Sequence, residues 1–222
     1  SVRLASFKPF LVLNFANSVS PGGGVRRGAK AQEEDLCRKS TLLTSLESER
    51  AKPYYLYHRA NDPYLASDAM ILSPYVEIVR DENNELLDEP IKVAVLTCAA
   101  PNLTRENQGL TDEQLEELLY QRIQGIVAMA ASLNYNKLVL GAWGCGAFKN
   151  PIEIVTRIFV DLLRNYNFEI VEFALATRND VNNSAFAEIP SELSSPKNCA
   201  ANFSSCCFNT STNCANGAVS IA

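Results

Sequence analysis

The sequence predicts an α/β layered domain in which helices cover both faces of a mixed, largely parallel sheet. Short apolar runs typical of buried strands alternate with stretches that carry apolar residues at helical spacing, and two glycine-rich loops each follow a strand. The 222 residues are 47% hydrophobic, which is enough for one domain of ordinary size. We expect that domain over residues 1–188, and a flexible tail rich in Ser, Asn, Ala, Thr and Cys over 189–222.

The first strand, loop and helix form the most informative part of the chain. The run Phe10–Phe15 is apolar except for Asn14, as expected of a strand buried on both faces. Three consecutive glycines follow, and glycine allows the backbone to take positive φ and to approach a ligand closely. The stretch Gln32–Leu46 then predicts a helix, with acidic residues at Glu33, Glu34 and Asp35 in its first turn.

Later segments continue the alternation of strands and helices. We expect an irregular connection rich in tyrosine over Ala51–Asp68, which contains the only histidine, His58. Thr111 and Gln114 have the spacing of a capping box, and they predict a helix that runs to about Leu133. The other expected elements are strands at Ala69–Ile78, Ile91–Thr97, Lys137–Leu140 and Phe168–Ala176, a hairpin turn at Asp81–Asn84, and a helix capped by Asn150.

The two glycine-rich segments, Gly22–Gly24 and Gly141–Phe148, each follow a predicted parallel strand. Ligands of open α/β sheets bind beyond the carboxyl ends of such strands, so both loops can close on one ligand, and a diphosphate suits their main-chain N–H groups. Neither loop matches the glycine pattern of a dinucleotide fold or a P-loop. The alternative is that these glycines only make tight turns, which is a weaker explanation for three in a row.

The adjacent carboxylates Glu33 and Glu34 are candidates for acid/base chemistry. On a helix their side chains diverge by roughly 100°, so they do not flank one bond as a pair; one can transfer protons while the other positions substrate. A helix start favours the charged carboxylate, whereas burial or a nearby diphosphate favours the protonated form. The alternative is that both are solvated residues of a first turn.

Composition excludes several classes of function. The net charge is −5 and the basic residues are scattered, except for Arg26, Arg27 and Lys30 beside the glycines, so we expect a local anion site and no direct DNA binding. The seven cysteines form no CxxC pair, which argues against zinc, and no base is implied beside Cys145 to make it a nucleophile. No long apolar run or signal sequence is present, so we expect a soluble intracellular protein, cytoplasmic or nuclear, without membrane contact.

One known family shares the motifs of this chain. The segment LNFANSVSPGGGVRRGAKAQEEDLCRKSTL resembles the signature of microbial-type poly(ADP-ribose) glycohydrolases, in which a triple glycine precedes Gln-Glu-Glu. The segments GAWGCGAFKNP, YVEIVRD and VLTCAAPN are also similar to later motifs of that family, and the similarity covers about Lys8 to Phe186.

The resemblance implies a macrodomain-like three-layer α/β/α sandwich and an enzyme. It would hydrolyse ribose–ribose O-glycosidic bonds of poly(ADP-ribose) and release ADP-ribose, without a metal or a cofactor. Glu34 would be the catalytic acid and base, and Glu33 would bind the leaving ribose. Phe148 would pack against the terminal ribose, which Asn17 would also adjoin. The other implied substrate-binding residues are Gly22, Gly23, Gly24, Gln32, Gly144, Cys145, Gly146 and Ala147, most of them around the diphosphate.

Two further expectations follow from the resemblance. Family members carry a longer region before the first strand, so the sequence is expected to be a fragment or to lack part of the sheet and of the adenine pocket. The substrate could be poly(ADP-ribose) or an ADP-ribosylated protein. The alternative functions are therefore a hydrolase of mono-ADP-ribosylated protein and an ADP-ribose-binding module without turnover.

Overall fold

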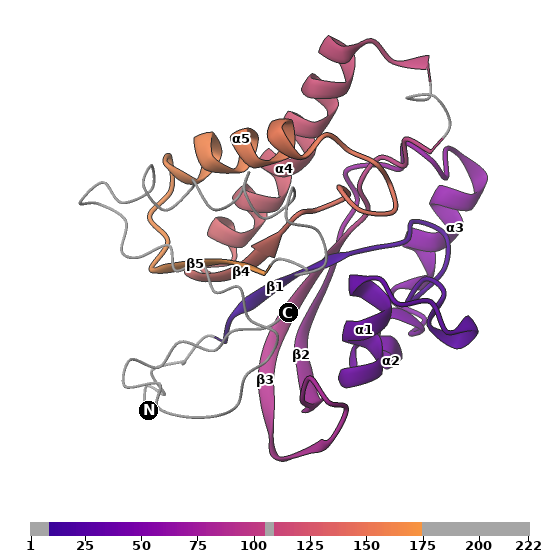
Figure 1. Cartoon of the computed structure of the whole chain (residues 1–222), viewed down its shortest axis with the longest axis vertical. Coiled ribbons are helices and arrows are strands. Elements are labelled where there is room, and N and C mark those ends of the chain that lie inside the picture. The colour runs from indigo at the N-terminus through magenta and orange to yellow at the C-terminus, as the bar shows by residue number, and fades with distance from the viewer. Residues whose placement is uncertain (1–8, 105–108, 175–222) are drawn as a thin grey trace.

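The computed structural model describes residues 9–104 and 109–174, and these form a three-layer α/β/α domain (Figure 1). The predicted fold class is therefore confirmed. Its centre is a five-stranded sheet in the order β2-β3-β1-β4-β5. The strands are β1 Leu11–Phe15, β2 Ile71–Arg80, β3 Leu86–Cys98, β4 Lys137–Gly141 and β5 Ile170–Ala174. The predicted tail at 189–222 lies outside the described residues, as do residues 175–188 of the predicted domain.

The sheet is parallel except for one hairpin. Strand β1 pairs in parallel with β3 on one side and with β4 on the other, and β4 pairs in parallel with β5. Strands β2 and β3 are antiparallel, which confirms the predicted hairpin, and β2 is an edge strand. Pro74 lies where the β2–β3 register shifts, between Ser73 and Val76, a position that tolerates a residue without an N–H.

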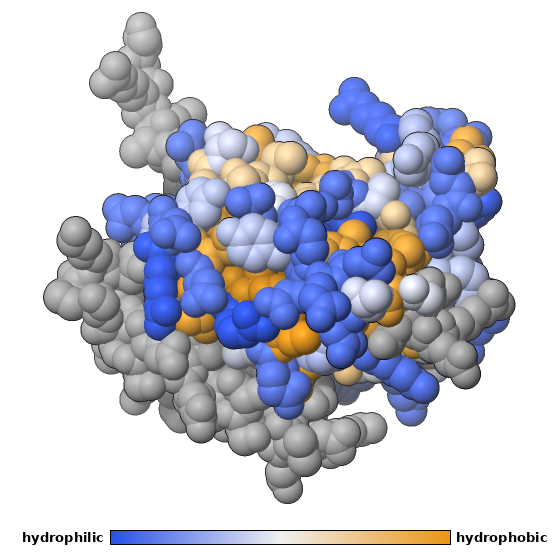
Figure 2. Space-filling view, turned by 90° about the horizontal axis from the view of Figure 1, so that it is seen from above, coloured by the Kyte–Doolittle hydropathy of each residue, from blue (hydrophilic) through white to orange (hydrophobic). Residues whose placement is uncertain are grey.

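Two helices cover one face of the sheet. They are α4 Asp112–Ser132 and α5 Ile152–Leu163, and their apolar stripes pack with the β-strand side chains into the larger core. The capping box predicted at the start of α4 is confirmed: the main-chain N–H of Gln114 donates to Oγ1 of Thr111 (3.3 Å), and that of Thr111 donates to Oε1 of Gln114 (3.0 Å). Seen from above, hydrophobic residues occupy the middle of the surface and hydrophilic residues surround them (Figure 2).

The opposite face is covered by three shorter helices, α1 Gln32–Lys39, α2 Leu42–Leu46 and α3 Lys52–Ala60, which enclose a second core. The single helix predicted over Gln32–Leu46 is therefore wrong, because the chain is extended at Ser40 (φ −143°, ψ 175°). Ser40 forms an isolated antiparallel bridge with Ile78, and the N–H of Thr41 donates to the carbonyl of Glu77 (3.0 Å). Pairing with the edge strand thus replaces one turn of helix.

Two other local predictions are also wrong. The tyrosine-rich stretch expected to be irregular contains α3, which begins with a proline in its first turn, where the missing N–H has no helical partner anyway. Its buried face carries Tyr54, Tyr55 and His58. Asn150 does not cap α5, because its side chain donates to the carbonyls of Pro101 (2.8 Å) and Gly144 (3.0 Å), and Pro151 occupies the cap position.

Candidate active site

A cavity of about 480 Å³ opens at the carboxyl ends of β1 and β4. The start of α1 lines one side of it, and the second of the two predicted glycine-rich regions, the loop after β4, lines the other. Eight of the predicted site residues are in its lining, namely Asn17, Gln32, Glu33, Glu34, Gly144, Gly146, Ala147 and Phe148. Among the described residues, Gly22, Gly23, Gly24 and Cys145 lie outside that lining.

Glu34 lines the cavity and differs from Glu33 in having one carboxylate oxygen without a hydrogen-bond partner among the described residues. Its Oε1 accepts a hydrogen bond from the main-chain N–H of Gly24 (2.8 Å), which fixes the side chain. Its Oε2 is buried and has no hydrogen-bond partner among the described residues. A buried carboxylate oxygen without a partner costs free energy, so this atom is suited to bind a ligand group or to exchange a proton with one.

Glu33 is held by the protein through both of its oxygens. Oε2 accepts from the main-chain N–H of Asn17 (2.7 Å), and Oε1 accepts from Nδ2 of Asn14 (3.4 Å). The residue is only 2% exposed, and this burial raises the pKa of Glu33 to about 8, with a smaller contribution from the charge of Glu34. The hydrogen bonds from Asn17 and Asn14 act in the opposite direction. Glu33 is therefore mostly protonated at pH 7.

The triple glycine holds the two carboxylates. Gly22 and Gly23 have positive φ (64° and 56°), a conformation that side chains disfavour. A β-carbon on Gly23 would lie 2.5 Å from Oε1 of Glu34 and 3.0 Å from Oε2 of Glu33. The glycines thus allow both carboxylates to approach the main chain. Their predicted contact with a diphosphate stays a prediction.

The second glycine loop is fixed to the segment that follows β3. Nε1 of the fully buried Trp143 donates to the carbonyl of Cys98 (3.0 Å), so this tryptophan packs in the core and does not line the cavity. The N–H of Leu103 donates to the carbonyl of Phe148 (2.9 Å). Burial raises the pKa of Cys145 to about 12, so its thiol stays protonated and is no nucleophile.

Asn14 is a site residue that we did not predict from the sequence. It is fully buried, and its Nδ2 lies between Oε1 of Glu33 (3.4 Å) and Oγ1 of Thr97 (3.2 Å) on β3. Its Oδ1 is buried without a hydrogen-bond partner among the described residues. A single polar residue in an otherwise apolar strand was the available signal, because buried polar groups need partners.

The predicted substrate-binding residues Asn17 and Gln32 also bind the protein itself. Oδ1 of Asn17 accepts from the N–H groups of Val19 and Ser20 (2.9 Å each), which forms the turn into the glycines. The side-chain amide of Gln32 donates from Nε2 to the carbonyl of Leu13 (2.9 Å) and accepts at Oε1 from the N–H of Phe15 (2.9 Å). Both side chains therefore shape the wall of the cavity.

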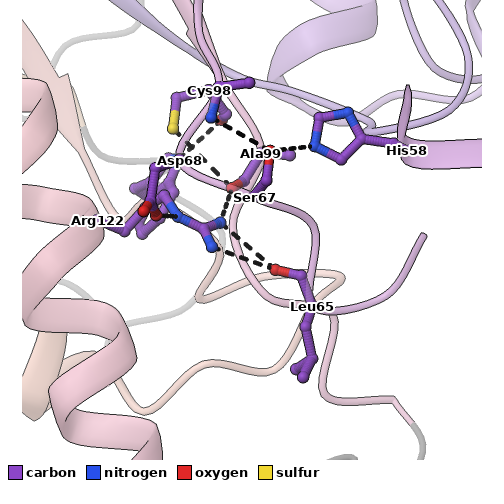
Figure 3. Close-up of polar contacts among 9 residues, drawn as sticks. His58, Leu65, Ser67, Asp68, Cys98, Ala99 and Arg122 are labelled. Carbon is purple, nitrogen blue, oxygen red and sulfur yellow. Dashed lines mark hydrogen bonds and ion pairs between the residues drawn. The ribbon is translucent and has the colours of Figure 1, made fainter. Parts of the chain in front are cut away.

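A second polar network lies outside the cavity and fixes the segment between α3 and β2 (Figure 3). The buried Arg122 of α4 donates to Oδ1 of Asp68 (2.7 Å) and to the carbonyl of Ala99 (2.9 Å). The fully buried His58 lies against the carbonyl of Tyr54 through Nδ1 (2.8 Å) and against Oγ of Ser67 through Nε2 (2.9 Å). The single histidine therefore has a structural role.

The described residues offer no metal site and no membrane span. No group of three His, Cys, Asp or Glu side chains in residues 9–104 and 109–174 is arranged to hold a metal ion. No helix in the same part of the chain is both long and apolar enough to cross a bilayer.

Comparison with known proteins identifies the family. The family described as "Microbial-type PARG, catalytic domain" matches residues 2–81, whereas no curated protein sequence matches. The chain is 37% identical to a poly(ADP-ribose) glycohydrolase (PARG) from Deinococcus radiodurans, solved in complex with ADP-ribose, with a TM-score of 0.76 and coverage of 83% of this chain and 76% of that one.

Two structures from Thermomonospora curvata give the same result. The poly(ADP-ribose) glycohydrolase bound to the inhibitor ADP-HPD is 39% identical, with a TM-score of 0.76 and coverage of 82% of this chain and 71% of that one. A second structure of the T. curvata protein is 38% identical, with a TM-score of 0.77 and coverage of 83% and 69%. At this identity and coverage, the chain belongs to the microbial-type poly(ADP-ribose) glycohydrolase family.

Proposed function

We propose that this protein hydrolyses ribose–ribose O-glycosidic bonds of poly(ADP-ribose) and releases ADP-ribose, with Glu34 as the catalytic acid and base. The observation that carries this proposal is the buried Oε2 of Glu34, which has no hydrogen-bond partner among the described residues and belongs to a residue of the cavity wall. Family membership supports the reaction, because the related structures are glycohydrolases that contain ADP-ribose or the inhibitor ADP-HPD.

The reaction requires one group that acts first as a general acid and then as a general base. In the first step the protonated carboxyl of Glu34 donates its proton to the departing ribose oxygen, the C–O bond breaks, and the terminal sugar becomes oxocarbenium-like. In the second step the resulting carboxylate of Glu34 takes a proton from water as the water oxygen bonds to the anomeric carbon. Glu34 is protonated again at the end, so the cycle consumes one water for each ADP-ribose released.

Glu33 would bind the leaving ribose while it stays neutral. Its pKa of about 8 keeps a proton on the carboxyl at pH 7, so the group can donate to a sugar hydroxyl. Its hydrogen bonds from the Asn17 main chain and the Asn14 side chain hold it in place. A neutral Glu33 also adds no negative charge to the site, where such a charge would oppose binding of a diphosphate.

The loop after β4 would bind the diphosphate and the terminal ribose. Gly144, Gly146 and Ala147 line the cavity, and Gly144 has positive φ (75°). Main-chain N–H groups of such loops bind phosphate oxygens without a formal positive charge. Phe148 lines the same cavity and would pack against the ribose, which would hold the anomeric carbon near Glu34.

The test compares three substitutions of glutamate by glutamine. Glu34→Gln should reduce release of ADP-ribose from poly(ADP-ribose) by about 10²-fold or more, because general acid–base catalysis is lost, while ADP-ribose still binds in calorimetry. Glu33→Gln stays neutral and hydrogen-bonding, so its loss should be smaller, about tenfold. Glu153→Gln is the matched control, since it removes an exposed carboxylate from the first turn of α5.

Each other outcome has a definite meaning. Unchanged release in Glu34→Gln would reject Glu34 as the acid. Wild-type protein that binds ADP-ribose without turnover of any substrate would indicate a binding module. Turnover of mono-ADP-ribosylated protein but not of polymer would indicate the mono-ADP-ribosyl hydrolase. We further propose that residues 1–188 are the catalytic unit, so a chain that ends at residue 188 should keep the wild-type rate.

A further inference from the structure

On the side that faces β4, the main chain at the end of β1 is not hydrogen-bonded to a strand. On its other side β1 stays paired with β3 from Leu11 to Phe15. On the β4 side the pairing stops after Val12, although β4 itself continues along β5 as far as Gly141. The carbonyl of Leu13 and the N–H of Phe15 therefore lack a strand partner, at the point where the cavity opens.

The side chain of Gln32 takes the place of the missing strand. In a parallel ladder, one residue of the neighbouring strand donates its N–H to one carbonyl and accepts from the N–H two residues further on. The amide of Gln32 does both, with Nε2 donating to the carbonyl of Leu13 and Oε1 accepting from the N–H of Phe15, each at 2.9 Å. It thus makes the two hydrogen bonds that one strand residue opposite Asn14 would make.

This bonding connects the end of β1 to the catalytic glutamates. Gln32 is the first residue of α1, directly before Glu33 and Glu34. Asn14 lies between Leu13 and Phe15, the two residues that the Gln32 amide contacts, and it donates to Oε1 of Glu33. Phe15 lines the cavity, and a β-carbon on Gly141 at the end of β4 would lie 2.9 Å from its ring. Movement of Gln32 would therefore shift the carboxylates and the cavity wall together.

We propose that Gln32 is a positioning residue for catalysis and that its amide is not used to bind substrate. By satisfying the main chain of β1 in place of β4, it keeps these two strands apart and the cavity open, and it fixes the first turn of α1. This inference rests on the proposed glycohydrolase function. The role needs a donor and an acceptor in one planar group, which a carboxylate or an apolar side chain does not supply.

The first experiment measures the main chain directly. In Gln32→Met the N–H of Phe15 loses its acceptor, so its amide hydrogen exchange should become at least about fivefold faster than in the wild type. The N–H of Ala16 is the internal control, because it donates to the carbonyl of Cys98 on β3 (3.3 Å) and should keep its rate. Unchanged exchange at Phe15 would overturn the proposal.

The second experiment uses the isosteric Gln32→Glu. At pH 8 its carboxylate faces the carbonyl of Leu13 without a proton, and kcat should fall by about tenfold to a hundredfold through misplacement of the glutamates. At pH 4.5, close to the ordinary pKa of a glutamate, about half of the carboxyls carry a proton and can again donate and accept, so kcat relative to the wild type at the same pH should recover at least about threefold. Gln124→Glu on the exposed face of α4 is the control and should change nothing.

The two experiments separate this inference from the proposed function. The dissociation constant for ADP-ribose in Gln32→Glu should stay within about threefold of the wild type, and this measurement also shows that the variant is folded. A loss confined to ADP-ribose affinity, or a loss of kcat that does not depend on pH, would overturn the positioning role. If wild-type protein releases no ADP-ribose, the proposed function fails, and the exchange of Phe15 still tests Gln32.

Discussion

Gly23 lies so close to Glu34 that a β-carbon on residue 23 would sit 2.5 Å from Oε1 of the carboxylate. The same carboxylate oxygen accepts the N–H of Gly24. The glycine segment and the first turn of α1 are therefore one unit, in which the absence of side chains on the loop sets the position of the carboxylate. This relationship explains why the middle residue of the three glycines carries no side chain.

Gly23→Ala should therefore inactivate the enzyme. The new methyl group displaces Glu34, so kcat should fall by at least about tenfold. The positive φ at residue 23 adds a cost of about 1–2 kcal/mol to the free energy of unfolding. Gly28→Ala is the matched control, because φ is also positive (78°) but no atom lies within 4 Å of the new methyl group. It should lose similar stability and keep its activity, as measured by denaturation and by ADP-ribose release.

Glu33 should make the stability depend on pH. Burial raises its pKa in the folded protein to about 8 from an ordinary value of 4.5, so the folded state binds the proton more tightly. Its contribution is fully present below pH 4.5 and is lost as the pH rises to about 8, by at most about 1.4 kcal/mol per pH unit. Chemical denaturation between pH 4.5 and 8 should therefore show the wild type losing stability relative to Glu33→Gln. A constant difference between the two proteins would contradict the raised pKa.

His58 should make the protein more stable as the pH rises, which is opposite to the effect of Glu33. Burial lowers the pKa of His58 in the folded protein, and the nearby charge of Arg122 lowers it further. The carbonyl of Tyr54 only accepts, so Nδ1 carries the proton and Nε2 accepts from the hydroxyl of Ser67. This stability is present above pH 6.5 and is lost as the pH falls. Because the chain has one histidine, a single imidazole signal in NMR should titrate below pH 6.5. A midpoint at or above 6.5 would reject this assignment.

Removing Asp68 or Arg122 from their ion pair should lower the free energy of unfolding by different amounts. The side chain of Arg122 is 2% exposed, whereas that of Asp68 is 70% exposed. Asp68→Ala leaves a buried guanidinium without its counter-charge, which should cost about 3 kcal/mol of unfolding free energy. Arg122→Met removes the buried charge and keeps the volume, leaving mainly the carbonyl of Ala99 without its donor, so it should cost only about 1–2 kcal/mol. Denaturation curves that rank the two variants in the reverse order would contradict this account.

Local sequence patterns predicted most of the fold. The apolar run of β1, the capping box at Thr111 and the glycine loop after β4 each appear where expected. A buried strand or helix requires apolar residues at a regular spacing, and that spacing can be read from residues close together in the sequence. Two of the predictions failed where a distant segment competes for the hydrogen-bonding groups of a residue. The bridge from Ser40 to Ile78 ends α1, and the contacts of Asn150 with Pro101 and Gly144 remove it from the cap of α5.

The sequence by itself determined the order of strand, glycine loop and acidic helix start, and it predicted that two glycine loops and a pair of glutamates belong to one site, since each loop follows a parallel strand and such strand ends meet at one edge of the sheet. Only the tertiary structure decided how the members of the site differ. It leaves one oxygen of Glu34 without a hydrogen-bond partner among the described residues, buries Glu33 between Asn14 and Asn17, and gives Gln32 the place of a strand. The physical reason is that a side chain's residue type fixes which hydrogen bonds it can make, whereas the partners that the folded chain brings within hydrogen-bond distance fix which of them it does make.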